Sequence, residues 1–173
     1  MSLPRFICLR GLINLPSLRF VSVRTIFAIL FTTAALNSAY AQNIAQPELT
    51  TKKIQVGMYI ITAEIAASNS ERQMGLMHRA TLGPNRGMLF VSDQPDKHCF
   101  WMRNTPLALT IAWLDEQGRI VSLADMQPKS DTNHCPTAPA VYALEMEQGW
   151  FKQRNIKAGV TLKSDQLFKV KSK

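Results

Sequence analysis

The sequence predicts a mainly β domain with two short helices, and three observations lead to this fold class. From residue 54 onward, short apolar runs of β type follow one another and are separated by turn residues. Helix signals occur in only two places, after Ser68 and near Gln148. Removal of an N-terminal segment of 41 residues would leave 132 of the 173 residues. A chain of that length forms one domain that buries about two-thirds of its unfolded surface.

The first 41 residues have the pattern of a cleaved secretory signal peptide. Four arginines precede an apolar run, Thr25–Leu36, that is closed by Ala39-Tyr40-Ala41. An uncleaved membrane anchor, a buried core helix and an organelle transit peptide are the alternatives. The run reaches the roughly 20 residues of a membrane span only by including Asn37, Ser38 and Gln42. We therefore expect a periplasmic or secreted protein with no stable membrane anchor after cleavage.

Cleavage would also change the charge of the chain. It would leave 16 Lys+Arg against 12 Asp+Glu, a net charge of +4 in place of +8. An exported protein rarely meets nucleic acid, so the basic tail at Lys163, Lys169, Lys171 and Lys173 predicts a solvated end. No nucleic-acid partner is expected.

The strands are predicted from apolar runs and the turns between them. Residues 42–51 are polar and lack periodicity, which predicts a flexible tether ahead of a single domain at 52–173. Leu109–Leu114 is apolar except for Thr110, as in a strand covered on both faces. The segment Asp115-Glu116-Gln117-Gly118 predicts the hairpin turn that follows. The other predicted strands are Ile54–Val56, Tyr59–Ile65, Met88–Val91, Cys99–Met102, Ile120–Leu123, Tyr142–Met146 and a last one near Val160–Leu162.

The two helices are predicted from a cap and from aromatic anchors. Ser68 and Glu71 have the Ser-x-x-Glu spacing of a capping box, in which each side chain binds the other residue's amide. His78 is expected to end this first helix, where a cation suits the helix dipole. The second helix is expected over about 148–155, with Trp150 and Phe151 turned inward.

Four segments together resemble a known family. They are Glu71-Arg72-Gln73-Met74-Gly75-Leu76-Met77, Gly87-Met88-Leu89-Phe90, Phe100-Trp101-Met102-Arg103-Asn104-Thr105, and Tyr142-Ala143-Leu144-Glu145 with Gly149-Trp150. In this order they resemble the bacterial domain-of-unknown-function 192 family, over about residues 52–163. The resemblance implies a compact antiparallel β-sandwich of jelly-roll type with short helices. It implies no activity, so no catalytic residues can be transferred.

The two cysteines of the mature chain predict a disulfide. Cys99 and Cys135 form an even pair in a compartment expected to be oxidising. Each follows a histidine, His98 and His134, which also suggests a metal site. Neighbouring residues on a strand point to opposite faces, so His98 and Cys99 would hardly converge on one ion. Free thiols and a Cys–His nucleophile are the remaining alternatives.

The polar residues near two strand ends form the candidate ligand site: Trp101, Arg103, Asn104, Thr105, Asp125 and Glu145. A charge among large apolar residues is rarely buried without a partner. We therefore predict that Arg103 pairs with Glu145 or Asp125. This pair either fixes the fold or belongs to a cleft for a small anion or sugar, with Trp101 or Trp113 as its apolar wall.

The function predicted from these residues is binding rather than catalysis. The chain has none of the common hydrolase, zinc-protease, phosphate-loop or dinucleotide motifs, so no catalytic residue, metal or cofactor is assigned. The leading hypothesis is an exported β domain that binds a small envelope ligand or a partner protein. One alternative is an envelope hydrolase that uses Asp125 and Glu145. The other is a metal handler that uses His98 and His134.

Overall fold

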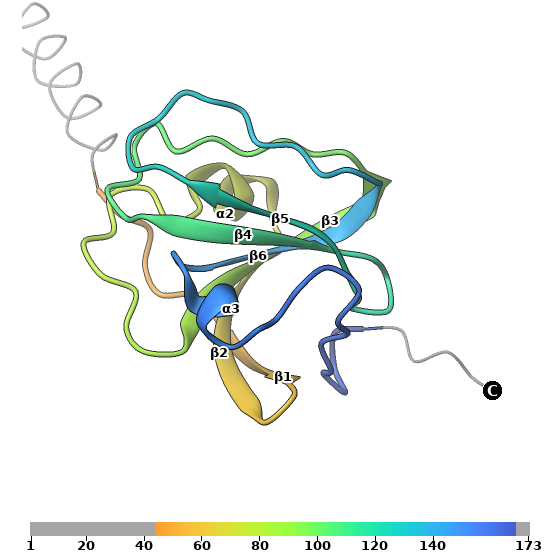
Figure 1. Cartoon of the computed structure of the whole chain (residues 1–173). Helices are drawn as coiled ribbons and strands as arrows, with labels where there is room; N and C mark the ends of the chain where they lie inside the picture. The colour runs from red at the N-terminus through yellow and green to blue at the C-terminus, as the bar shows by residue number, and fades with distance from the viewer. Residues whose placement is uncertain (1–43, 169–173) are drawn as a thin grey trace, which may run out of the picture. The chain divides into compact units, whose positions relative to one another are not determined.

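The computed structural model describes residues 44–168, which form one curved six-stranded sheet with two short helices (Figure 1). The strands lie in the order β1-β2-β3-β6-β4-β5. The elements are β1 (Thr51–Val56), β2 (Tyr59–Ala66), α2 (Asn69–Met74), β3 (Arg86–Asp96), β4 (Leu109–Leu114), β5 (Ile120–Met126), β6 (Ala140–Glu147) and α3 (Trp150–Gln153).

The sheet is mixed, which corrects the expected antiparallel sandwich of jelly-roll type. β2 and β3 run parallel, while the other neighbouring strands are antiparallel. Residues 67–85 connect β2 to β3 and contain α2, the kind of crossover that parallel neighbours need. A single sheet therefore stands where two packed sheets were expected.

Apolar side chains cover both faces of this sheet, and β4 shows why. Its residues alternate between two buried clusters, with Ala112 and Leu114 in the first and Ile111 and Trp113 in the second. The first cluster packs under Trp150 and Phe151 of α3, and the second includes Leu76, which follows α2. All six residues of β4 are buried, as predicted for Leu109–Leu114.

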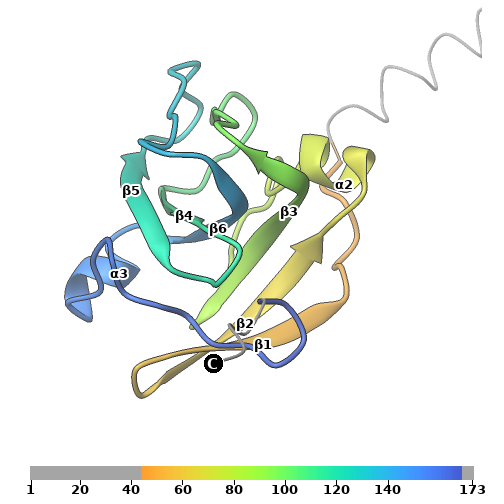
Figure 2. The same cartoon turned by 90° about the vertical axis from the view of Figure 1, so that its right-hand side faces the viewer.

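The chain after α3 bridges the two edge strands of the sheet. Lys163 pairs with Gln55 of β1 through two backbone hydrogen bonds of 2.8 and 2.9 Å. Thr161 pairs with Arg119, just before β5. Figure 2 shows this C-terminal segment lying beside β1 and β2. The strand expected near Val160–Leu162 is therefore only a pair of isolated bridges, yet it links the sheet's ends.

The predicted helix signals are partly confirmed. The Glu71 amide donates to the Ser68 hydroxyl at 3.3 Å, and the Ser68 amide donates to the Glu71 carboxylate at 2.8 Å. The Ser68 amide and then the Ala67 amide, which donates to the same carboxylate at 3.0 Å, lower the pKa of Glu71. The helix ends at Met74, so His78 does not end it as expected but lies in a later turn with φ of 61°. α3 is shorter than the expected helix, although Trp150 and Phe151 are buried as predicted.

The predicted disulfide between Cys99 and Cys135 is present. It joins the loop after β3 to the loop before β6. Beside it, Phe100 and His134 exchange two backbone hydrogen bonds of 2.8 Å each. This pair is an isolated bridge, so the strand predicted at Cys99–Met102 does not form. The disulfide and bridge hold two loops together that no sheet ladder connects.

Residues before β1, within the segment expected to be a tether, lie against the domain. The Gln46 amide donates to the Gly75 carbonyl at 2.8 Å. The Leu49 amide donates to the buried carboxylate of Glu64 at 2.8 Å. The predicted signal peptide lies outside the described residues.

Candidate functional site

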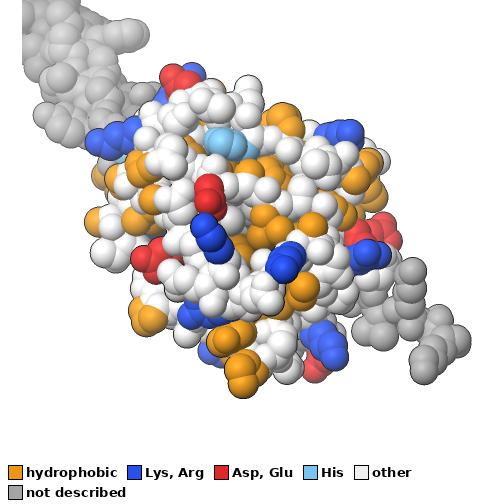
Figure 3. Space-filling view, in the orientation of Figure 1, with side chains coloured by type: hydrophobic (Ala, Val, Ile, Leu, Met, Phe, Trp, Pro, Cys, Tyr) orange, Lys and Arg blue, Asp and Glu red, His pale blue; other side chains and the backbone are white. Residues whose placement is uncertain are grey.

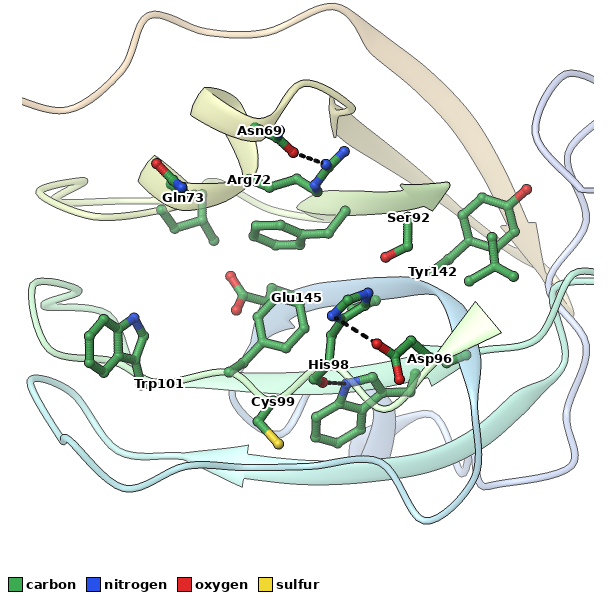
Figure 4. Close-up of a pocket in the computed structure, with 18 of the residues that line it drawn as sticks. Asn69, Arg72, Gln73, Ser92, Asp96, His98, Cys99, Trp101, Tyr142 and Glu145 are labelled. Carbon is green, nitrogen blue, oxygen red and sulfur yellow. Dashed lines mark hydrogen bonds and ion pairs between the residues drawn. The ribbon is translucent and has the colours of Figure 1, made fainter. Parts of the chain in front are cut away.

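A pocket of about 800 Å³ lies between α2, β3, β6 and the loop that carries Trp101 (Figure 4). The turn after α2 and the end of β3 form one side, and the loop from His98 to Trp101 forms the other. Aromatic, acidic and other polar residues line this pocket. They include Phe90, Phe100, Trp101, Trp113, Tyr142, Asp93, Asp96, Glu145, Arg72, Gln73, Ser92, His98 and Thr105.

Glu145 is the buried carboxyl group of this pocket. On β6 it stands opposite Met88 of β3 and Ile111 of β4, so its side chain shares their face of the sheet. The residue is only 4% exposed, and burial raises the pKa of its carboxyl group to about 8. Within residues 44–168 this carboxyl group makes no hydrogen bond or ion pair. Figure 4 shows it directed into the pocket.

Aromatic rings form the wall beside this carboxyl group. Phe100 packs edge-to-face against Phe90 and Trp113, with ring centroids 5.0 and 6.3 Å apart. The Trp113 indole donates to the His98 carbonyl at 3.3 Å, which ties the ring to the loop. Trp101 is 43% exposed and lies at the rim. The wall therefore combines fixed rings with one ring open to solvent.

The charged groups of the pocket are mainly acidic. Asp93 and Asp96 of β3 join Glu145 in its lining, against the single guanidinium of Arg72. Arg72 donates to the Val91 carbonyl at 2.9 Å, to the Ala67 carbonyl and to the Asn69 side chain. His98 Nδ1 lies 3.8 Å from Asp96 Oδ2. Arg72 is thus held by the fold, and Asp96 also accepts the Lys97 amide at 2.7 Å.

Three of the six predicted ligand-binding residues line this pocket: Trp101, Thr105 and Glu145. Arg103 does not pair with Glu145 or Asp125, because its Nε lies 2.7 Å from Asp131 Oδ1 at the surface. Its guanidinium also stacks on the Trp101 ring, 4.1 Å from the centroid. Asn104 is exposed, and its carbonyl accepts the His78 amide at 2.9 Å.

Asp125 lies on the opposite face of the sheet from Glu145. Asp125 stands opposite Thr110, whose hydroxyl donates to its carboxylate at 2.5 Å. Glu145 stands opposite Ile111, the next residue of β4. Since adjacent strand residues point to opposite faces, the two carboxylates cannot share a groove. Asp125 instead lines a separate hollow of about 370 Å³ near α3. This placement overturns the two-carboxylate hydrolase.

Sequence reasoning missed Arg72, Gln73, Asp93 and Asp96 as pocket residues. Arg72 and Gln73 follow the capping box directly, so the helix prediction already placed them on a short exposed helix. Asp93 follows the predicted strand Met88–Val91, and polar residues after a buried strand are a weak signal for a site. The sequence could not show that α2 lies next to β3, where Arg72 donates to the Val91 carbonyl.

The described residues show neither a metal-binding cluster nor a membrane-spanning helix. Between residues 44 and 168, no group of three or more His, Cys, Asp or Glu side chains is placed to hold a metal ion. Cys99 and Cys135 are bonded to each other, which removes both thiols as ligands. In the same range, no helix is long and apolar enough to cross a membrane.

Two exposed apolar side chains lie at a hairpin away from the pocket, whereas exposed Trp101 lies at the pocket rim. Met58, 83% exposed, and Ile60 lie at the β1–β2 hairpin. Figure 3 shows some apolar side chains at the lower end of this face, where Figure 1 places the hairpin, and others near its centre.

Comparison with known proteins gives a family and a fold. No curated protein matches the chain. A crystal structure from Sinorhizobium meliloti, whose description proposes a transcription regulator, is 26% identical with a TM-score of 0.66. The match covers 68% of this chain and 96% of that one. A protein of unknown function from Novosphingobium aromaticivorans is 29% identical with a TM-score of 0.65, over 70% of this chain and 91% of that one.

The family model named DUF192, described as an uncharacterized ACR, matches residues 51–164. This range contains every strand and helix of the domain. It agrees with the resemblance seen in the sequence over residues 52–163. The chain belongs to the DUF192 family.

Proposed function

We propose that this protein is an exported domain that binds a small ligand in the pocket at Glu145. The observation that carries the proposal is a buried carboxyl group, without a described partner, that faces a cavity of about 800 Å³. Burying a polar group without a partner costs free energy, and a ligand that contacts the group recovers part of it. Small-molecule sites have this form: an apolar wall, few polar groups and a volume of about 300–1,000 Å³.

The four segments that carry the family resemblance support the same pocket as the binding site. Each of the four segments that carry the DUF192 resemblance supplies a residue to the pocket lining: Arg72, Phe90, Trp101 and Glu145. These segments are separated along the chain, and all four contribute to this pocket. A small-ligand site is therefore favoured over a partner-protein surface elsewhere on the domain.

Export is proposed from two independent features. The N-terminal segment has the composition of a cleaved signal peptide, and the domain contains the Cys99–Cys135 disulfide. Disulfides persist in oxidising compartments such as the periplasm. A binding role is favoured over hydrolysis because Asp125, the expected second carboxylate, lies on the other face of the sheet.

A thermal-shift screen of the purified protein against sugars, nucleotides, amines and cell-wall fragments tests the proposal. A ligand present at a hundredfold excess over its Kd stabilises the folded state by about 2.7 kcal/mol and so raises Tm. Trp101→Ala should abolish the shift because it opens the pocket wall without emptying the core. Met58→Ala, at the distant hairpin, should retain it. A shift that persists in Trp101→Ala, or no shift with any class, contradicts a small-ligand site here.

A further inference from the structure

We propose that the ligand of this pocket is a small organic cation, an ammonium group on an apolar body, whose charge is placed against Glu145 and the aromatic wall. This inference rests on the proposed function and adds the chemical class of the ligand.

The charges of the pocket favour a cation. Three carboxyl groups line it: those of Asp93 and Asp96, which are exposed, and that of Glu145, which becomes charged when it ionises near pH 8. The guanidinium of Arg72 is bound to two carbonyl oxygens and an amide oxygen of the protein. An anionic ligand would therefore meet the carboxyl groups without an available cation from Arg72. Low-dielectric walls strengthen the negative potential inside such a cleft.

The aromatic wall suits the same ligand. Phe100 packs edge-to-face against Phe90 and against Trp113, and all three rings line the same pocket as Glu145. Aromatic faces attract cations within about 6 Å of the ring centroid, and aromatic cages bind quaternary ammonium groups in this way. Trp101 already holds the Arg103 guanidinium 4.1 Å from its ring centroid. A cation with a bulky apolar body would contact both the rings and the carboxylate.

The titration of Glu145 distinguishes a cation from a neutral ligand. Burial raises the pKa of Glu145 to about 8, so the empty pocket holds the protonated acid at pH 7. A cation prefers the carboxylate, so its affinity rises as pH increases through 8. A neutral hydrogen-bond acceptor prefers the acid, so its affinity falls over the same range. The other titratable groups of the pocket are Arg72 of α2, Asp93 and Asp96 of β3, His98 after β3, and Tyr142 of β6.

Calorimetric titration of the full protein with quaternary ammonium ions tests the inference, because these ions do not titrate themselves. The probes are choline and benzyltrimethylammonium, and the neutral control is 3,3-dimethylbutan-1-ol, which has the shape of choline without its charge. At least one cation should bind about tenfold or more tightly than the alcohol. Its affinity should rise about tenfold between pH 7 and pH 9, following the ionised fraction of a group with a pKa of about 8.

Substitutions of single acidic residues show where the cation binds. Glu145→Gln should lower the cation's affinity at pH 9 about tenfold or more and remove the pH dependence. Asp93→Asn, at the exposed rim, should weaken binding more mildly. Asp125→Asn removes the same charge from the opposite face of the sheet and should change affinity by less than about twofold.

Two results would overturn the inference, and they differ in what they leave standing. If the alcohol binds as tightly as both cations and Trp101→Ala abolishes its binding, the pocket takes a neutral ligand and the proposed function survives. If neither cation nor any member of the thermal-shift screen binds, the cationic ligand and the proposed function fail together.

Discussion

At the residue scale, Glu145 differs from the other buried glutamate of the domain. Glu64 is 2% exposed, and Arg79 holds it with two hydrogen bonds of 2.8 and 3.1 Å. Glu145 has no such partner among the described residues and is penalised by burial instead. A buried pair keeps a carboxylate in the fold, whereas an unpaired carboxyl group opposes folding once it ionises. Glu145 therefore costs stability at a place where a ligand can contact it.

This cost predicts how stability changes with pH. Unfolded chains release the Glu145 proton near the ordinary pKa of 4.5, while the folded chain holds it until about pH 8. The folded state binds more protons between these values, so the free energy of unfolding falls as pH rises from about 4.5 to 8 and then levels off. Glu145→Gln should remove this slope and stabilise the protein at pH 9 by about 2–4 kcal/mol.

Urea unfolding at pH 5, 7 and 9 measures this effect. Glu147→Gln is the matched control, because Glu147 lies two residues further along the same strand and is exposed. It should leave the slope unchanged. Equal slopes in Glu145→Gln and the unmodified protein would show that Glu145 does not keep its proton in the folded state.

The sequence could identify some of these residues but not their partners. Glu145 was found because a charge flanked by Leu144 and Met146 is unusual in a strand. The rule that such a charge needs a partner then gave a wrong answer for Arg103, which pairs with Asp131 instead. A single strand pattern cannot show that a cavity opens beside a carboxyl group.

At the element scale, local turns and the strands of the sheet were predicted, whereas a segment that pairs through one isolated bridge was mistaken for a strand. The hairpin turn after Leu114 and the capping box at Ser68 depend on residues close in sequence, and both form as predicted. Cys99–Met102 has apolar residues in a strand-like pattern, but within residues 44–168 its only bridge partner is His134, 34 positions beyond Phe100. Short apolar runs without a neighbouring strand cannot be assigned by periodicity alone.

The disulfide takes the place of the missing strand in joining these loops. It closes a loop with a sequence separation of 36. In the chain-entropy model, a loop of this size stabilises the folded state by about 4 kcal/mol. Replacing both cysteines, Cys99→Ser with Cys135→Ser, should lower the urea midpoint by a corresponding amount and speed proteolysis in residues 127–139.

Reduction of the unmodified protein provides the control for this pair of substitutions. Treatment with a reductant should lower the urea midpoint as far as the double serine variant does. A double variant with the unmodified protein's midpoint would mean that the Phe100–His134 bridge alone holds the loops.

At the scale of the whole molecule, strand order could not be read from the sequence. Each strand of the sheet was located, but the pairing of β3 with β6 and of β6 with β4 joins segments far apart along the chain. The pairing of residues 62–66 with 86–90 is parallel because a crossover separates them. Such contacts depend on how the faces pack, so the fold class could be predicted while the topology could not.

The closure of the sheet by its C-terminal segment depends on one glycine. Gly118 has φ of 77°, and a Cβ there would lie 2.7 Å from both the Leu162 carbonyl oxygen and the Phe168 ring. The Leu162 amide also donates to the Gly118 carbonyl at 2.8 Å. Gly118→Ala must therefore push the closing segment away from the β4–β5 turn, in addition to straining the backbone.

Gly57→Ala separates these two costs, because Gly57 has φ of 58° but open space around its Cβ position. Backbone strain alone should cost Gly57→Ala about 1 kcal/mol. Gly118→Ala should cost about 2–4 kcal/mol, since it adds a steric clash to the same strain. Hydrogen exchange at the Leu162 and Lys163 amides should accelerate only in Gly118→Ala. Equal costs and unchanged exchange would mean that the segment adjusts without loss, and that the edges of the sheet do not need it.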